Sequence, residues 1–419
     1  MGGYYIIFMS GLRASFAQDF YWGTSTSAYQ IEGGGSNTDW WRFERAVGTP
    51  AVETCGVACD SWNRYEEDLD IAASLGLNAF RLSVEWARVE PHRGEIDVAV
   101  LEHYGRVLDA CWARGLAPVV TFHHFTLPLW VADAGGFESP DIVNSIAHYA
   151  RVVAEALGEK IAFACTINEP NIVAQMGYLY GFFPPAVTDW ARFRAVNETL
   201  RLAHRAMVDA LRAGPGSYPV GLALSMAQYV SVNGGDERLA SLRREMEDEY
   251  LKVVQDDDFL GVQCYTRHDI GPEGMVWDFE GERTSMGYRY WPQCVEYTLH
   301  RAAQMTAIPL VVTENGIGTE DDTQRIRYLA EALEGLRRAR RGGVDVRGYF
   351  QWSLLDNFEW TLGYGPKFGV VSVDRNTMTR SLKPSADWYA RYVRHGPSPT
   401  ANGEGSRRRP GPTLPELTD

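Results

Sequence analysis

The sequence predicts an α/β fold in which eight parallel strands close into a single (β/α)8 TIM barrel. The first observation is a series of short apolar runs, such as residues 308–313, that suit strands buried on both faces. The second is that stretches of helical length with one apolar face separate these runs, and several end at a glycine, as at Gly76 and Gly115. Strands that alternate with helices form parallel sheets, and eight such units close into a barrel.

Residues that interrupt regular structure bound the predicted strands. The first strand is aromatic and leads into a polar loop, the fourth runs toward Pro170, and the seventh is followed by Asn315-Gly316, a pair typical of turns. In chain order the predicted strands cover residues 20–24, 78–83, 117–122, 161–167, 220–225, 259–265, 308–313 and 346–352.

The predicted helices lie between these strands. Their apolar residues recur at helical spacing, and the charged face of residues 238–254 is most simply a face exposed to solvent. In chain order the predicted helices cover residues 66–75, 101–114, 142–157, 190–213, 238–254, 295–307 and 323–341.

We predict three segments along the chain. Residues 1–15 form an N-terminal extension, and residues 16–394 form the barrel as one domain, because no linker-like composition interrupts them. Residues 395–419 are rich in proline, glycine, serine and arginine and poor in apolar residues, which is a composition typical of a disordered tail.

The charge and the hydropathy of the chain exclude several classes of partner. A formal net charge of −14 disfavours binding to nucleic acid and to anionic membranes. No apolar run reaches the length that crosses a bilayer, and the apolar residues 4–9 lack the preceding basic region of a signal peptide. We therefore expect a cytoplasmic protein without nucleic-acid or membrane partners. The sequence predicts no oligomeric state.

Six cysteines in 419 residues do not make the framework of a small disulfide-rich protein. Cys55 and Cys59 could supply half of a metal site, but no second pair and no clustered histidine completes it. We expect neither a metal nor a cofactor.

Two glutamates at the ends of buried strands are the main candidates for chemistry. Glu314 directly follows the strand at residues 308–313, and Glu169 stands between the strand at residues 161–167 and Pro170. An ionised side chain in such a place is costly unless it has a partner or a task. Taken singly, each glutamate is as well explained by a salt bridge at a strand end. Two carboxylates on separate strand ends are what a glycosidase requires.

Further polar and aromatic side chains fall at the predicted strand ends. In a barrel the carboxyl ends of the strands share one face, and active sites lie there. Alone, His124 is more often structural, and Trp352 and Trp360 more often belong to a core. Their position beside the two glutamates reverses that preference. The candidates at this face are Gln30, Arg81, His124, Asn168, Glu169, Tyr265, Glu314 and Trp352.

Six segments in order resemble glycoside hydrolase family 1, the β-glucosidase family. The resemblance spans residues 16–393, most of the chain. A single such motif would be weak evidence, whereas six in the family's order are specific. The segments are Trp22-Gly23 through residues 30–33; residues 80–83 with Trp86, Arg88 and Pro91; His124-Phe125 with Leu127-Pro128; residues 166–170; residues 313–316; and residues 352–360.

The resemblance implies a role for each matching residue. It implies that Glu314 is the nucleophile and Glu169 the general acid/base, with Arg81 and Asn315 in support. A nucleophile must be ionised, whereas an acid must keep its proton near neutral pH, so its pKa must rise from about 4.3. The implied sugar-binding residues are Gln30, His124, Asn168, Tyr265, Glu359 and Trp360, with Trp352 as the floor on which the sugar stacks.

The implied activity is that of a retaining β-glycosidase, which removes terminal non-reducing β-D-glucosyl residues by a double displacement. Its partners would be small β-glucosides and oligosaccharides such as cellobiose. Alternatives are a β-galactosidase or β-fucosidase of the same family, a transglycosidase, and a sugar-binding barrel without catalysis. The presence of both Glu169 and Glu314 disfavours the last of these.

The chain departs from the family pattern near the end of the sixth strand. Gln263-Cys264-Tyr265 stands where the family usually has Asn-Tyr-Tyr. Tyr265 is kept, but the contact that the asparagine makes near the nucleophile is not assured for Gln263. Residues 268–291 are expected to form a wall on the leaving-group side, so the preferred leaving group stays open.

Overall fold

The computed structural model describes residue 16 and residues 20–396. The predicted N-terminal extension at residues 1–15 lies outside the described residues. The predicted tail at residues 395–419 also lies outside them, except for its first two residues. His395 is the last residue of helix α14 (Pro384–His395), and Gly396 follows it.

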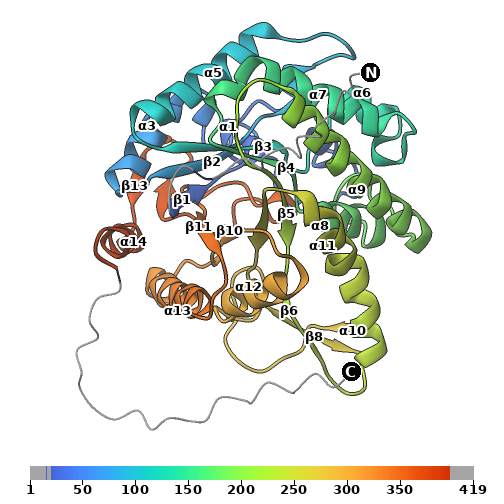
Figure 1. Ribbon diagram of the computed structural model, residues 1–419, viewed down its shortest axis with the longest axis vertical. Helices are drawn as coiled ribbons and strands as arrows, with labels where there is room; N and C mark the ends of the chain where they lie inside the picture. Colours follow the sequence, from blue (N-terminus) through green and yellow to red (C-terminus); the bar gives the residue numbers. More distant parts are fainter. Residues whose placement is uncertain (1–15, 17–19, 397–419) are drawn as a thin grey trace, which may run out of the picture.

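Eight parallel strands form a closed barrel in which each strand pairs with both neighbours (Figure 1). The first and last strands close it, with Thr24 opposite Gln351. The eight strands match the eight predicted ones, and the fold class is confirmed. In order around the barrel they are β1 (Tyr21–Ser25), β11 (Val346–Trp352), β10 (Leu310–Asn315), β7 (Phe259–Gln263), β5 (Val220–Ser225), β4 (Phe163–Asn168), β3 (Ala117–His123) and β2 (Ala79–Ser83).

Helices surround the barrel (Figure 1). The predicted helix at residues 238–254 is three consecutive segments, α10 (Asp236–Arg243), the π-helix η4 (Arg244–Asp248) and α11 (Glu249–Val253). Helix α14 was not predicted; Pro384 occupies its first turn, and the hydroxyl of Tyr389 donates to the carbonyl of Gly23 at 3.0 Å. The other long helices are α3 (Ser61–Ser74), α5 (Val98–Ala113), α7 (Ile142–Leu157), α9 (Trp190–Ala213), α12 (Cys294–Met305) and α13 (Asp322–Arg341).

Two small sheets and several short helices lie in the connections. The three-stranded sheet joins β6 (Gln228–Ser231), β8 (Arg267–Gly271) and β9 (Gly274–Val276), and the two-stranded sheet joins β12 (Val371–Val373) and β13 (Arg380–Leu382). The short helices are α1 (Ala28–Glu32), α2 (Asp39–Phe43), α4 (Trp86–Val89), α6 (Leu129–Asp133), α8 (Pro170–Ala174), η1 (Gly136–Glu138), η2 (Gly158–Lys160), η3 (Gln175–Leu179), η5 (Val254–Asp256) and η6 (Trp360–Leu362).

The barrel interior is a packed core below the carboxyl ends of the strands. Aromatic side chains fill it, and Phe163 packs edge-on against Phe259 and Phe350. Gly23 makes room for these rings, because a Cβ atom there would lie 2.4 Å from the ring of Phe350. Since the interior is filled, a ligand can bind only above it, at the carboxyl ends.

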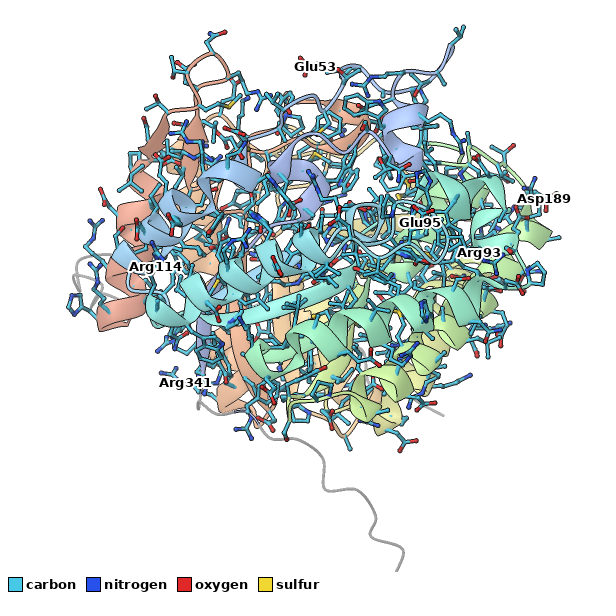
Figure 2. All side chains as sticks on the ribbon, turned by 90° about the horizontal axis from the view of Figure 1, so that it is seen from above. Glu53, Arg93, Glu95, Arg114, Asp189 and Arg341 are labelled. Atoms are coloured by element: carbon cyan, nitrogen blue, oxygen red, sulfur yellow. The ribbon has the colours of Figure 1, made fainter. Side chains whose placement is uncertain are left out.

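Charged side chains such as Asp189 and Arg341 are exposed and lie at the periphery of the protein (Figure 2). Within the described residues, every helix is too short or too polar to cross a membrane.

Candidate active site

Glu314 lies at the carboxyl end of β10, almost completely buried, among three hydrogen-bond donors. Arg81 Nη1, from β2, donates to Oε1 at 2.5 Å, and Gln263 Nε2, from β7, donates to the same oxygen at 2.9 Å. The hydroxyl of Tyr265 donates to Oε2 at 2.6 Å. Just past the strand, Gly316 lies against the carbonyl of Trp352, where a Cβ atom would be only 2.0 Å away, so a larger residue would not fit.

These neighbours oppose the effect of burial on the pKa of Glu314. The pKa of Glu314 lies above its ordinary value because burial raises it by more than the Arg81 guanidinium and the hydrogen bonds from Tyr265, Arg81 and Gln263 lower it. Arg81 is itself completely buried. Without Glu314 its positive charge would be uncompensated, and without Arg81 the carboxylate would be uncompensated in the same way. Glu314 is therefore surrounded by groups that stabilise its ionised form.

Glu169 lies at the end of β4 in a different environment. It has a left-handed backbone conformation with φ of 44°, held by a hydrogen bond from its N–H to the carbonyl of Ala223. Burial raises its pKa to about 8, and the charge of Glu314 adds to the rise. The side chain of Ser225, a hydrogen-bond partner, and the more distant charge of Arg81 lower it only in part. The neighbours of Glu169 thus offset the effect of burial on its pKa less than the three donors do at Glu314, which favours the protonated form of Glu169.

Asn168 connects the two sides of the site. Its Oδ1 accepts from Arg81 Nη2 at 2.6 Å and from Gln263 Nε2 at 2.8 Å. Its Nδ2 is thereby directed toward His124, whose Nε2 lies 3.2 Å away. Burial lowers the pKa of His124 well below its ordinary value, and the charge of Arg81 adds to this effect. His124 is therefore neutral and offers one donor and one acceptor.

The remaining predicted sugar-binding residues gather beside His124. The ring of His124 is nearly parallel to the rings of Trp352 and Trp360, with centroids 6.0 and 6.1 Å away. Trp352 Nε1 donates to Glu359 Oε1 at 3.4 Å, and Gln30 Nε2 donates to the carbonyl of Phe358 at 2.7 Å. Burial raises the pKa of Glu359 to about 8, with the charge of Glu314 among the further causes.

Asn315, predicted to support the site, points away from the two glutamates. Its Nδ2 donates to the carbonyl of Cys264 at 2.6 Å and to the hydroxyl of Tyr328 at 3.1 Å. That hydroxyl in turn donates to the carbonyl of Tyr265 at 2.9 Å. Asn315 thus contacts the backbone of the segment that carries Tyr265, directly at Cys264 and through the hydroxyl of Tyr328.

Three residues that no sequence pattern singled out interact with Glu169. Ser225 ends β5, the one predicted strand from which no candidate was taken; the strand-end rule would have found it. The charge of Glu169 also contributes to the raised pKa values of Tyr229 and Tyr288. Both tyrosines lie in connections whose path the sequence does not reveal.

Within residues 20–396, no group of three or more His, Cys, Asp or Glu side chains is placed to hold a metal ion. All six cysteines are buried and unbonded to one another. Cys55 and Cys59 donate to the carbonyls of Tyr29 and Asp356 instead, at 3.1 and 3.4 Å.

A barrel that gathers two buried carboxyl groups at one face, one of them beside a guanidinium, is the arrangement of a glycosidase. The sequence comparison defines the family more closely. The model of glycosyl hydrolase family 1 matches residues 12–261 and 249–396. The chain belongs to this family and is a glycoside hydrolase.

Three similar proteins illustrate the relationship. β-Glucosidase A of Thermotoga maritima is 31% identical, with 91% of this chain and 98% of the relative covered. A bifunctional β-D-glucosidase/β-D-fucosidase of Bifidobacterium breve is 32% identical over 90% of this chain and 98% of its own. A solved β-glycosidase, BGL167, is 39% identical with a TM-score of 0.85, covering 94% of this chain and 100% of its own.

Gln263 provides a test of the groups that lower the pKa of Glu314. Replacing Gln263 by leucine removes the donor that Glu314 and Asn168 share, so the pKa of Glu314 should rise. We expect the acid limb of the kcat/KM profile to move to higher pH and kcat/KM at its optimum to fall about tenfold, the scale of one hydrogen bond to a charged group. The measurement is the pH profile with an aryl β-glucoside.

Gln175→Leu is the matched control, because this glutamine is also buried and is not among the hydrogen-bond partners of Glu314. It should leave the acid limb in place. An acid limb that does not move in Gln263→Leu would show that Gln263 serves packing only.

Proposed function

We propose that the chain is a retaining β-glucosidase in which Glu314 is the nucleophile and Glu169 the general acid/base. The observation that carries this assignment is the contrast between the two carboxyl groups. Burial raises the pKa of both groups, but Glu314 accepts hydrogen bonds from Arg81, Gln263 and Tyr265, which favour its ionised form. The pKa of Glu169 is raised to about 8, and the charge of Glu314 adds to that rise.

In the first step, Glu314 attacks the anomeric carbon while Glu169 gives its proton to the glycosidic oxygen. The bond to the leaving group breaks, and a covalent glycosyl ester forms on Glu314. The ester has no negative charge, so the repulsion that adds to the effect of burial on the pKa of Glu169 disappears. Glu169, now ionised, can act as a base.

In the second step, Glu169 removes a proton from water, and the water oxygen displaces Glu314 from the anomeric carbon. Two inversions return the β configuration. Arg81 and Tyr265 then stabilise the carboxylate that leaves. The same intermediate gives transglycosylation when a sugar hydroxyl replaces the water.

The sugar would lie between the predicted polar contacts and the indole of Trp352. Gln30, His124, Asn168, Glu359 and Trp360 are proposed to bind its hydroxyl groups, as the family resemblance implies. Their grouping supports this proposal, because His124 contacts Asn168 on one side and stacks toward Trp352 and Trp360 on the other. Asn168 has its Oδ1 satisfied by two donors, and its Nδ2 carries two hydrogens, of which one faces His124 and the other can bind a sugar oxygen.

We propose that the main substrates are β-glucosides, including short oligosaccharides such as cellobiose. We also propose that the protein is located in the cytoplasm. The names of the relatives support glucose as the sugar that is released, since both curated relatives described above are β-glucosidases. The name of the Bifidobacterium breve relative adds β-D-fucosides as a second candidate. β-Galactosides are the third class of substrate to compare with glucosides and fucosides.

The test is a panel of p-nitrophenyl β-D-glycosides that differ only in the sugar. We expect the highest kcat/KM with the glucoside, lower values with the fucoside and galactoside, and β-glucose as the first product seen by proton NMR. Preference for another sugar would correct the substrate. α-Glucose as the first product would exclude a double displacement.

A further inference from the structure

The carboxyl end of β5 lies beside Glu169 and faces the mouth of the barrel. Ala223 of this strand packs in the barrel interior, and its carbonyl accepts from the N–H of Glu169 at 2.8 Å. Side chains two positions apart in a strand point to the same face. Ser225 therefore faces the same way as Ala223, nearer the carboxyl end, and its hydroxyl donates a hydrogen bond to the carboxyl group of Glu169.

Backbone hydrogen bonds fix the residues that follow Ser225. The N–H of Met226 donates to the carbonyl of Gln263 at 2.8 Å, which attaches this segment to β7. The N–H of Ala227 donates to Oε1 of Glu247, a buried residue of η4, at 3.3 Å. The place of the Ser225 hydroxyl is thus determined by β7 and η4 as well as by its own strand.

Asn171 joins this segment to the helix that follows Glu169. Asn171 is completely buried, and its Nδ2 donates to the carbonyls of Ser225 and Met246 at 2.7 and 2.8 Å. In the same helix, α8, the N–H of Ile172 donates to the carbonyl of Glu169 at 2.9 Å. One side-chain amide therefore connects α8, the end of β5 and η4.

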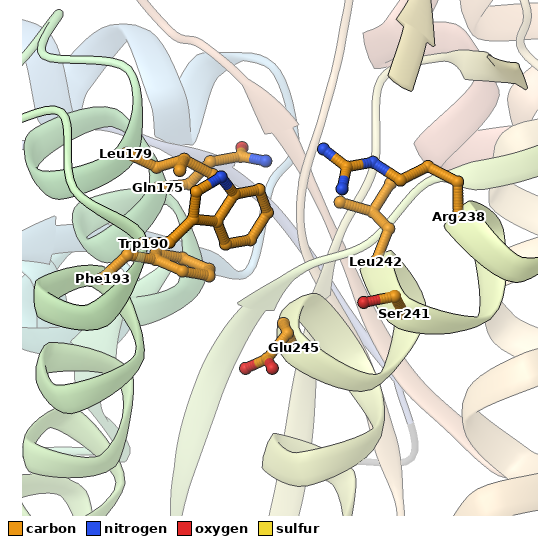
Figure 3. A pocket seen from close by; sticks show the side chains of 8 residues that line it. All are labelled: Gln175, Leu179, Trp190, Phe193, Arg238, Ser241, Leu242 and Glu245. Carbon is orange, nitrogen blue, oxygen red and sulfur yellow. The ribbon is translucent and has the colours of Figure 1, made fainter. Parts of the chain in front are cut away.

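Helix η4 is itself anchored to α9. Glu245 of η4 lines the pocket between α9 and α10 in Figure 3, and its carboxylate accepts from Arg194 Nε at 3.1 Å. Its carbonyl accepts from Asn197 Nδ2 at 3.2 Å. In the pocket, the guanidinium of Arg238 lies over the indole of Trp190, 5.1 Å from its centroid, so the protein itself occupies that ring face. The pocket thus belongs to the support of η4.

The hydrogen bond from Ser225 has a consequence for the proton of Glu169. A hydroxyl group has one hydrogen to donate, so it occupies one oxygen of the carboxyl group. The proton of the acid is then carried by the other oxygen. A general acid must lie within hydrogen-bond reach of the atom that it protonates, so it matters which oxygen carries the proton.

We propose that Ser225 is a positioning residue for the general acid/base. Its hydroxyl holds one oxygen of Glu169, so that the other oxygen presents the proton to the glycosidic oxygen. Asn171 acts through Ser225, because it fixes the backbone that carries this hydroxyl. The inference rests on the proposed function, since it requires Glu169 to be the general acid.

The test is kcat/KM of Ser225→Ala with a series of aryl β-glucosides from phenyl to dinitrophenyl. A phenolate leaves poorly without a proton, whereas a dinitrophenolate leaves unaided. We expect kcat/KM to fall about tenfold with phenyl glucoside, the scale of one hydrogen bond to a charged group, and by less than about twofold with dinitrophenyl glucoside. A general structural fault would lower both values alike.

The pH profile gives a second readout in the same variant. The hydroxyl of Ser225 lowers the pKa of Glu169, so its removal should raise this pKa. The alkaline limb of kcat/KM with phenyl glucoside should therefore move to higher pH, by up to about one unit for a tenfold change in the ionisation equilibrium. The other titratable groups that act on Glu169 are kept in this variant; they are Arg81, Tyr229, Tyr265, Tyr288 and Glu314.

Three further variants serve as controls. Ser225→Thr keeps the hydroxyl and should keep the wild-type dependence on the leaving group. Asn171→Ala should show the selective loss of Ser225→Ala, and combining the two should add no further selectivity between the substrates. Ser83→Ala is the matched control and should resemble the wild type; Ser83 also ends a barrel strand, but its oxygen accepts from the N–H of Ala28 at 2.7 Å.

Equal losses of Ser225→Ala with phenyl and dinitrophenyl glucosides, or an alkaline limb that stays in place, would overturn the inference. The proposed function fails by a different result. If Glu169→Ala turns over phenyl glucoside as the wild type does and keeps its alkaline limb, then Glu169 is not the general acid.

Discussion

Glu314→Ala is expected to abolish the hydrolysis of every β-glycoside, with kcat reduced by a factor on the order of 10⁵–10⁶, the scale seen when a covalent nucleophile is removed. The substitution removes the group proposed to form the glycosyl ester, and no other carboxylate accepts the same three donors. The measurement is kcat with an activated aryl glucoside, for which chemistry is easiest to detect.

The fold should survive this substitution at a cost in stability. Arg81 is completely buried and would lose the carboxylate that compensates its charge, which costs about 3–5 kcal/mol of the free energy of unfolding. Circular dichroism should therefore show a folded protein with a lower Tm. Glu90→Gln is the control; Glu90 is a buried glutamate that accepts from Trp86 Nε1, and this variant should keep its turnover. Substantial turnover by Glu314→Ala would show that another group is the nucleophile.

Glu169→Ala is expected to lose activity in proportion to the basicity of the leaving group. An alkoxide cannot depart without a proton, whereas a dinitrophenolate departs unaided. The first step should therefore be very slow with cellobiose and much less impaired with a dinitrophenyl glucoside. The second step should then limit the rate, because the base that activates water is missing.

Azide should restore turnover of the activated substrate by Glu169→Ala, because this anion attacks without a base. Two inversions give the β-glycosyl azide. Azide added to Glu314→Ala should attack the substrate directly and give the α-azide. Proton NMR distinguishes the two products, and the opposite pairing of variants and anomers would mean that the two roles are reversed.

The pH profile of Glu169→Ala supplies an independent check. Glu169 must be protonated in the first step, so the alkaline limb of kcat/KM reports the loss of its proton, near the raised pKa of about 8. The acid limb reports the protonation of Glu314. With an activated substrate, the variant should keep the acid limb and lose the alkaline one. An alkaline limb that persists belongs to another group.

The barrel could be predicted because its evidence is local. Each strand is a short apolar run, and residues such as Gly76 and Gly115 end the helices between them, so neighbouring residues alone define the pattern of eight units. The elements that were missed lack that evidence. The sheet of β6, β8 and β9 is built from short polar strands, and β6 pairs with β8 across about forty residues of chain. Its register depends on contacts that no local pattern encodes.

The candidate site was predicted as a set of strand ends, since the parallel strands of a barrel all end at one face. Nine of the eleven predicted residues have side chains in the contact network of the two glutamates or in the ring cluster beside it, and the amide of Gln30 donates to the carbonyl of Phe358, next to Glu359. The side chain of Asn315 instead donates to the carbonyl of Cys264 and to the hydroxyl of Tyr328. The direction of a side chain just past a strand end depends on local bulges, and β10 has a register shift there.

The sequence by itself determined which residue types could do the chemistry and that they would share one face of the barrel. It also placed Gln263 near the end of its strand, without showing which residues its amide would contact. Only the tertiary structure decided which carboxyl group is surrounded by donors. Arg81 lies 233 positions before Glu314 in the chain, and Gln263 lies 95 after Asn168. A pKa depends on burial and on charges a few ångströms away, and those neighbours come together only when the barrel closes.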